Sequence, residues 1–275
     1  MRVAVRHHTR YAYASPAKSV LQLLRMTPRN HDGQTVKSWR IVPNCEATLK
    51  GGEDPLGNLT HMLSLPGPIS ELDIAVEGVV ETEDRHGVVR GTYEKFPTEL
   101  YLRETPLTVT DSALKQFAAD TTSQSGDDRL DRLHCLLIGI YSGIKFDTAP
   151  THAATTAAEA FALRKGVCQD LTHIFIACAR QLGIPARYIG GHMFRSDGVT
   201  QQEAGHAWAE AHVEGLGWVG FDPANGICPT EGHVRVASGL DYLGAAPIRG
   251  TRQGGADEQM RVAVQINQAR SQWQS

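Results

Sequence analysis

Apolar and polar residues alternate along much of the first hundred positions, which is the pattern of β-strands with one buried face. Clusters of Gly, Pro, Asn and Asp separate the alternating runs, and no apolar stripe of helical period occurs before about residue 110. The strongest runs cover residues 1–5, 38–42 and 69–82, and the turn signals lie at 30–33, 50–54, 55–58, 66–68 and 84–87. The pattern predicts a β-rich amino-terminal domain over residues 1–105, most simply a small sandwich.

After residue 105 apolar residues recur every three or four positions, as in helices that cover a core. This stripe predicts helices over residues 112–120, 130–144, 156–163 and 168–182. The last helix is the clearest, because the stop signals Gly183 and Pro185 follow it directly. Alternating runs return at residues 186–193, 205–214, 217–222 and 260–266. Helices followed by strands predict an α+β second domain over residues 106–275.

Composition and size agree with two globular domains. The chain has 275 residues, of which 41% are hydrophobic and 21% are charged. No apolar run approaches the roughly 20 residues that span a bilayer. Residues 1–12 carry three arginines with no apolar segment behind them, so we see no secretory signal. We therefore expect a cytoplasmic protein without a membrane partner.

The net charge of −3 is unevenly distributed along the chain. Residues 1–40 carry eight Lys and Arg against one acidic residue, which leaves −10 for the remainder. This basic stretch lacks the clustered run and the interleaved aromatic residues of a nucleic-acid surface. A solvated face is the better interpretation, and we expect no nucleic-acid partner.

One of the five cysteines stands apart from the others. No cysteines form a CxxC pair or a metal-ligand spacing with histidine, so we expect reduced thiols and no metal site. Cys168 opens the helix predicted over residues 168–182, where free N–H groups and the helix dipole stabilise a thiolate. The alternative is a small buried thiol, which Cys178 on the apolar stripe of that helix fits well.

A reactive thiolate needs a base and a group that orients the base. Alternation over residues 205–214 places His206 and Trp208 on one face of a strand, and Asp222 ends the next strand. If the turn pairs His212 with Trp218, His206 lies diagonal to Asp222 on one face, about 7–8 Å away by backbone. A tight even-numbered turn would place them on opposite faces. A Cys–His–Asp site therefore requires an odd-length loop or a bulge in this hairpin.

These residues resemble a known family. The similarity is to the transglutaminase-like superfamily, and more narrowly to the bacterial transglutaminase-like cysteine peptidases with their amino-terminal β domain. The residues that carry it are 166–170 (GVCQD), 183–188 (GIPARY), 206–208 (HAW) and 217–223 (GWVGFDP), then 11–13, 24–29, Gln34, Trp39 and 54–58 upstream, and 233–242 and 247–250 downstream. The resemblance covers nearly the whole chain.

The resemblance implies a papain-like core, with helices packed on an antiparallel sheet, and acyl transfer without a cofactor. It makes Cys168 the nucleophile, His206 the general base and acid, and Asp222 the orienting carboxylate. The backbone N–H of Cys168 is the natural first donor to the oxyanion. Further donors, or walls of a substrate cleft, are expected among Gln169, Trp208 and Trp218.

Three functions remain open at this stage. Hydrolysis of peptide or isopeptide amides is favoured, with protein-glutamine transamidation second. A catalytically idle binding module is third, because an idle protein need not keep all three groups. Leu240 and Gly244 depart from the family pattern, which usually has arginine and an acidic residue there. We expect a protein or peptide substrate, and the sequence leaves the oligomeric state open.

Overall fold

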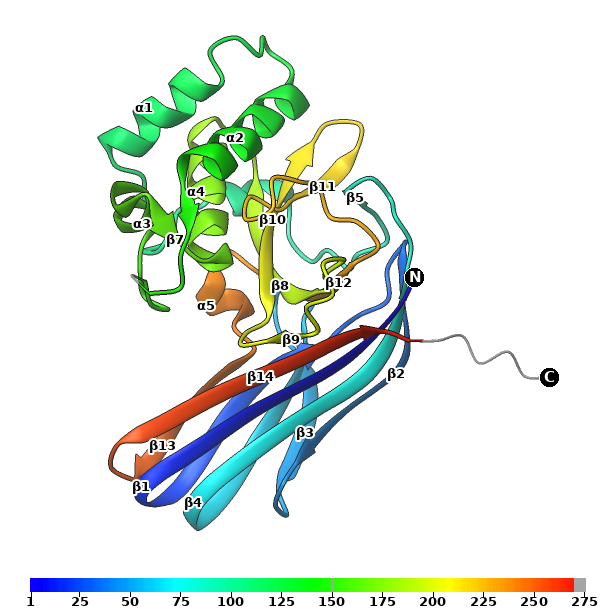
Figure 1. The fold of residues 1–275 in the computed structure, drawn as a ribbon, viewed down its shortest axis with the longest axis vertical. Helices are drawn as coiled ribbons and strands as arrows, with labels where there is room; N and C mark the ends of the chain where they lie inside the picture. Colours follow the sequence, from blue (N-terminus) through cyan, green and yellow to red (C-terminus); the bar gives the residue numbers. More distant parts are fainter. Residues whose placement is uncertain (150, 270–275) are drawn as a thin grey trace, which may run out of the picture.

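The computed structural model describes residues 1–149 and 151–269 and shows two antiparallel sheets, with helices beside the smaller one (Figure 1). The larger sheet has seven strands, ordered β2-β4-β1-β14-β9, with β13 paired to β1 and β3 paired to β4. Its strands are β1 (Arg2–Thr27), β2 (Gln34–Pro43), β3 (Thr48–Glu53), β4 (Leu59–Thr82), β9 (Gln201–Gln202), β13 (Ile248–Gly254) and β14 (Glu258–Gln268).

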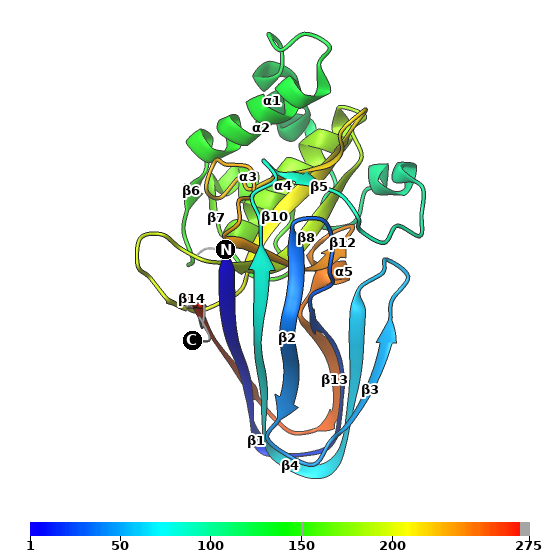
Figure 2. The same ribbon diagram turned by 90° about the vertical axis from the view of Figure 1, so that its right-hand side faces the viewer.

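Two long strands make this sheet sandwich-like. β1 and β4 pair along most of their length, and their register shifts between Ala12 and Ala17, where both strands turn (Figure 2). One apolar cluster, which includes Tyr11, Leu24 and Leu72, joins side chains from both halves of the bent sheet. The predicted turn at 66–68 marks this bend rather than a strand end, and the prediction of a turn over 50–54 is wrong, because β3 runs through most of it.

The carboxy-terminal strands belong to the larger sheet. β14 pairs with β1 from Val3 opposite Gln268 to Tyr13 opposite Glu258, and β13 pairs with the second half of β1. The predicted second domain over residues 106–275 would have placed both strands with the smaller sheet. Alternation identifies a strand but not its partner, and this pairing spans more than 200 residues. In the opposite direction, β5 (Val88–Val89) joins the smaller sheet.

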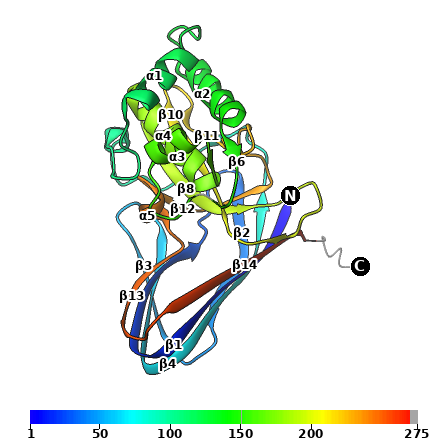
Figure 3. The same cartoon turned by 60° about the vertical axis from the view of Figure 1, so that its left-hand side comes forward.

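The smaller sheet has the order β12-β8-β10-β11-β5. Helix α4 lies beside β10 (Figure 3). Ala207, Ala209 and Ala211 of β10 belong to one apolar cluster with buried residues of this helix. The remaining strands are β8 (Ala186–Met193), β10 (His206–Val213), β11 (Gly217–Phe221), β12 (His233–Gly239) and the short pair β6 (Lys145–Phe146) and β7 (Lys165–Gly166); the helices are η1 (Thr98–Leu102), α1 (Ser112–Thr121), α2 (Arg129–Gly143), α3 (Ala157–Leu163), α4 (Cys168–Gln181) and α5 (Tyr242–Ala245). This α+β core confirms the predicted fold class.

Two buried amides join the sheets at the edge of β12. Gln34 accepts the backbone N–H of Arg235 and donates to its carbonyl, both at 2.8 Å. Asn58 makes the same reciprocal pair with the backbone of Ser238, at 2.7 and 2.8 Å. Each amide thereby replaces a neighbouring strand and covers an edge that would otherwise expose unpaired backbone groups. Within the described residues, no helix is long and apolar enough to cross a membrane.

Candidate active site

Cys168 is the first residue of α4, as the sequence predicts. Val167 precedes the helix, and its N–H donates to the carboxylate of Asp170 at 2.8 Å. Thr151 donates to the same carboxylate oxygen at 2.7 Å. A side chain at Gly166 would come within 2.7 Å of Asp170, so only glycine fits there. These contacts fix the turn that presents Cys168 and the free first-turn amides of the helix.

The β10–β11 hairpin brings His206 and Asp222 together. His212 pairs with Trp218 and Val213 pairs with Gly217, which leaves a three-residue loop. This confirms the predicted odd-length connection and register. His206 Nε2 lies 2.7 Å from Oδ2 of Asp222, whose side chain is fully buried. The pairing uses Nε2 of the imidazole and leaves Nδ1 as the nitrogen available to Cys168.

Two residues that the sequence analysis missed complete the surroundings of Asp222. Asn225 donates its side-chain N–H to Oδ2 at 2.7 Å, and its backbone N–H lies 3.3 Å from Oδ1. His233 Nε2 lies 3.2 Å from Oδ2. Because the N–H of Thr230 donates to His233 Nδ1 at 3.1 Å, the ring proton is on Nε2 and points at the carboxylate. Asn225 could have been identified from the sequence, because it lies in the turn that directly follows Asp222. No sequence pattern near His233 indicated its role.

Electrostatics favour a charged pair. Burial would lower the pKa of His206, but the charge and hydrogen bond of Asp222, followed by those of Cys168, raise it to about 10. Burial would raise the pKa of Asp222, but the charges and hydrogen bonds of His206 and His233 hold it well below its usual range. The raised pKa of His206 and the lowered pKa of Asp222 both indicate an imidazolium beside a carboxylate. Cys168 lies close enough to add to the rise in the pKa of His206.

The predicted cleft residues lie in three different places. Gln169 follows Cys168, and its amide nitrogen is 3.4 Å from the carbonyl of Ala153. Trp208 is buried beside His206, with ring centroids 6.1 Å apart, and packs as structural support. The structure does not bring Trp218 to the site, because it pairs with His212, six residues along β10 from His206. The guanidinium of Arg187 instead lies over the Trp218 ring, with Cζ 3.9 Å from the ring centroid.

Tyr188 of β8 lies close enough to Cys168 for the charge of the thiolate to act on its phenol. Burial, and then the charge on Cys168, raise the pKa of Tyr188 well above its usual value. Tyr188 follows Arg187 in β8 and faces the helices, whereas Arg187 faces the opposite side of the sheet. A protonated phenol at this position is a hydrogen-bond donor, which the pattern of β8 alone did not single out.

The site also contains three groups of the kind that bind metals. The ring nitrogens of His206 and His233 and a carboxylate oxygen of Asp222 all lie within 4.8 Å of one another. A metal at this point would displace the hydrogen bonds that both histidines make to Asp222. The existing contacts therefore form a closed hydrogen-bonded set around one carboxylate.

Comparisons with known proteins agree with this architecture. A family model described as the bacterial transglutaminase-like N-terminal region matches residues 3–81, and one for the transglutaminase-like superfamily matches residues 115–223. An uncharacterized protein of Mycobacterium leprae is 28% identical over 279 residues, covering 96% of this chain and 98% of its own. One of Mycobacterium tuberculosis is 26% identical over 277 residues, covering 90% and 87%. A crystal structure from Cytophaga hutchinsonii, named "Putative Cysteine Protease", superposes with a TM-score of 0.80 at 18% identity, covering 100% of this chain and 92% of that one, and shows the same fold.

Proposed function

The chain belongs to the transglutaminase-like superfamily and carries the bacterial transglutaminase-like N-terminal region, and on that premise we propose that it is a cysteine-dependent amide hydrolase. Cys168 is the nucleophile, His206 the general base and acid, and Asp222 the residue that orients His206. The substrate is a peptide or isopeptide amide. The observation that carries the proposal is the buried 2.7 Å contact between His206 and Asp222, with Cys168 acting on the same imidazole.

The reaction follows from these positions. The Cys168 thiolate attacks the amide carbonyl, and the backbone N–H at the start of α4 stabilises the oxyanion. His206 then gives its proton to the leaving amine as the C–N bond breaks, which leaves a thioester on Cys168. Water, deprotonated by His206, attacks the thioester, and the thiolate leaves with a new carboxylic acid as the product. Asp222 keeps the imidazole oriented through both steps and stabilises it whenever it carries the proton.

Water is the proposed acceptor because it needs no binding site of its own, whereas transamidation requires a second, amine-binding site. The Cytophaga protein is named as a protease, which is the same class of reaction for that protein.

All five cysteines are free, which supports a reducing compartment such as the cytoplasm.

The test separates three outcomes in one assay. The full chain is incubated with a mixed peptide substrate and a labelled primary amine, and Cys168→Ala serves as the control. New carboxyl ends that depend on Cys168 support hydrolysis, whereas incorporation of the amine identifies a transamidase. Neither product, together with a Cys168 that alkylates no faster than Cys45, identifies a binding module and overturns the proposal.

A further inference from the structure

Two buried histidines face each other where the two sheets meet. His7 of β1 and His192 of β8 are 3% and 6% exposed, and their ring centroids lie 5.6 Å apart in a T-shaped arrangement. The residues that pair with them in their own sheets, Val264 of β14 and Val234 of β12, belong to one apolar cluster. This cluster joins the larger sheet to β12 at the edge of the smaller one. Neither histidine takes part in the proposed reaction.

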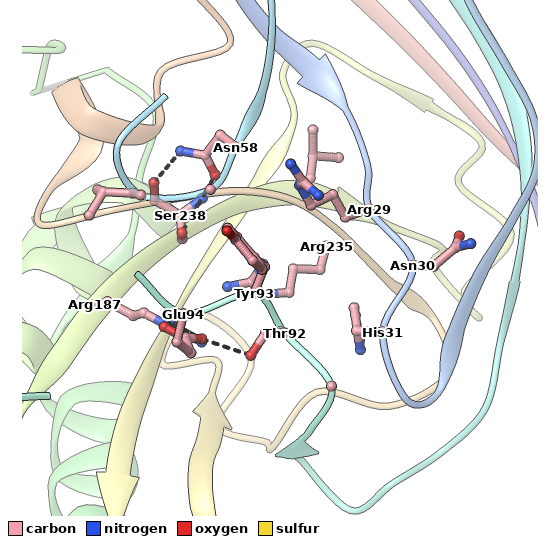
Figure 4. A pocket seen from close by; sticks show the side chains of 14 residues that line it. Arg29, Asn30, His31, Asn58, Thr92, Tyr93, Glu94, Arg187, Arg235 and Ser238 are labelled. Carbon is pink, nitrogen blue, oxygen red and sulfur yellow. Dashed lines mark hydrogen bonds and ion pairs between the residues drawn. The ribbon is translucent and has the colours of Figure 1, made fainter. Parts of the chain in front are cut away.

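The contact between the sheets is hollow beside this cluster. A cavity of about 660 Å³, partly open to solvent, lies between the amino-terminal domain and the smaller sheet (Figure 4). Val236 of β12 belongs both to the apolar cluster and to the wall of the cavity. On the same wall, the side chain of Asn58 bonds the backbone of Ser238 (Figure 4). Solvent therefore reaches the interface close to the cluster, and a small separation of the sheets would admit it to the histidines.

Neither ring has acceptors for a second proton. His7 Nε2 lies 3.0 Å from Oγ1 of Thr9, whereas His7 Nδ1 is buried without a partner among the described residues. His192 Nδ1 is likewise buried and without a partner there. An imidazolium donates from both nitrogens, so protonation of either ring would leave a buried N–H unpaired and place a charge in an apolar cluster.

The nearby charged groups oppose protonation of the pair. Burial, and then the charge of His8, lower the pKa of His7 to about 4. Burial, and then the charges of His7 and His206, lower the pKa of His192 to about 3. No carboxylate of the described chain contributes to either shift, so both rings are neutral at pH 7.

The strands packed around the pair offer no compensating negative charge. Their side chains nearest to the two rings are apolar or aromatic: Val76 of β4, Val264 of β14, Val234 of β12 and Trp39 of β2. Strand β9 consists of two uncharged glutamines. The charged side chains of β12 are engaged elsewhere, since His233 bonds Asp222. Arg235 bonds Glu210.

From this geometry we propose that His7 and His192 make the contact between the two sheets acid-sensitive, so that protonation of either ring opens the contact at β12. In the open form both rings are hydrated and have an ordinary pKa of 6.5, whereas in the closed form the pKa is about 4 or lower. The contact is therefore stable above about pH 6.5 and weakens as the pH falls toward 4. At pH 5 each histidine shifts the equilibrium toward the open form by about thirtyfold. Opening would also withdraw His233 from Asp222, a consequence for catalysis that rests on the proposed function.

Hydrogen exchange of the full-length chain, followed by mass spectrometry at pH 7 and pH 5, tests the proposal. The amides of Arg235 and Ser238 on β12 donate across the contact, to Gln34 and Asn58. After correction for the intrinsic effect of pH, their exchange is expected to be at least about tenfold faster at pH 5, with no change in α2. His192→Phe, which cannot be protonated, should lose most of this acceleration. The matched control is His86→Asn, at a side chain that is 93% exposed, and it should behave as the wild type.

Every result bears on the proposal. Acceleration confined to β12 and lost in His192→Phe supports it. Equal exchange at both pH values, equal acceleration of β12 and α2, or acceleration that persists in His192→Phe overturns it. If circular dichroism shows that His192→Phe does not fold, His7→Gln carries the same comparison, because its side chain can still bond Thr9 and cannot be protonated. The measurement involves no turnover, so its outcome is independent of the proposed hydrolysis.

Discussion

Removing the charge of Asp222 should return His206 to an ordinary histidine. The pKa of His206 rises from 6.5 to about 10 in the folded protein, and the charge of Asp222 is the largest cause that raises it. That difference corresponds to roughly 5 kcal/mol of preference for the imidazolium. In Asp222→Asn the side chain keeps its shape but loses its charge. Burial then opposes only the smaller contribution of Cys168, so we expect the pKa of His206 to fall toward or below 6.5.

Histidine nitrogen chemical shifts, followed by NMR from about pH 5 to 11, measure this change directly and need no substrate. The chain has 12 histidines, and the spectrum of His206→Gln identifies the resonance of interest. Asp73→Asn is a matched control, because Asp73 lies 3.4 Å from His8 in an exposed pair. The reasoning fails if wild-type His206 titrates near 6.5, or if it still titrates near 10 in Asp222→Asn.

Three further outcomes follow from the same contacts. At about pH 6, where an ordinary thiol is protonated, iodoacetamide should modify Cys168 faster than exposed Cys45, as followed by peptide mass spectrometry. His206→Ala should reduce the ratio of the two rates at least about tenfold. Equal rates for the two cysteines would contradict an activated thiol. His233→Phe should slow the same alkylation severalfold, because it removes a hydrogen bond to the charged carboxylate of Asp222. His233→Gln can still donate that hydrogen bond and should retain more of the rate. No change of rate in either variant would exclude a positioning role for His233. Gln34→Ala should lower the free energy of unfolding, measured by urea titration, by about 3 kcal/mol, because it leaves two backbone groups of Arg235 without partners. If the free energy falls no more than in the exposed control Gln116→Ala, water replaces the amide.

The parts of the molecule that the sequence predicts correctly depend on local chemistry. The apolar stripe from Leu171 onward and the stop signal at Gly183 predict α4, which runs from Cys168 to Gln181. Alternation alone leaves the β10–β11 register open, and the condition that His206 and Asp222 share a face selects the odd-length loop that the structure shows. Both signals are contained within about twenty residues, so a single sequence carries them in full.

The parts that escape prediction depend on contacts between distant segments. β14 has the alternation of any strand, and nothing in residues 258–268 indicates that its partner is β1. His233 reaches Asp222 only because β12 lies at the edge of the sheet next to β8. The hairpin register suggests that Trp218 lies near the site, but the pairing of Trp218 with His212 places it toward the far end of β10. Pairing partners of this kind are set by tertiary packing, which overrides local pattern.

The contacts along β12 connect the amino-terminal domain to the candidate chemistry. His233, at the start of β12, donates to the carboxylate that holds His206. Two residues further on, the backbone of Arg235 pairs with Gln34 of β2. The edge of the same strand next meets Asn58, immediately before β4, through Ser238. Without the amino-terminal domain β12 would be an open edge strand, free to shift its register and to withdraw His233 from Asp222. The domain therefore supports the candidate site through hydrogen bonds from two side-chain amides to the backbone of one strand. The return of β13 and β14 to β1 closes the chain around that contact and holds the two sheets together from both ends of the sequence.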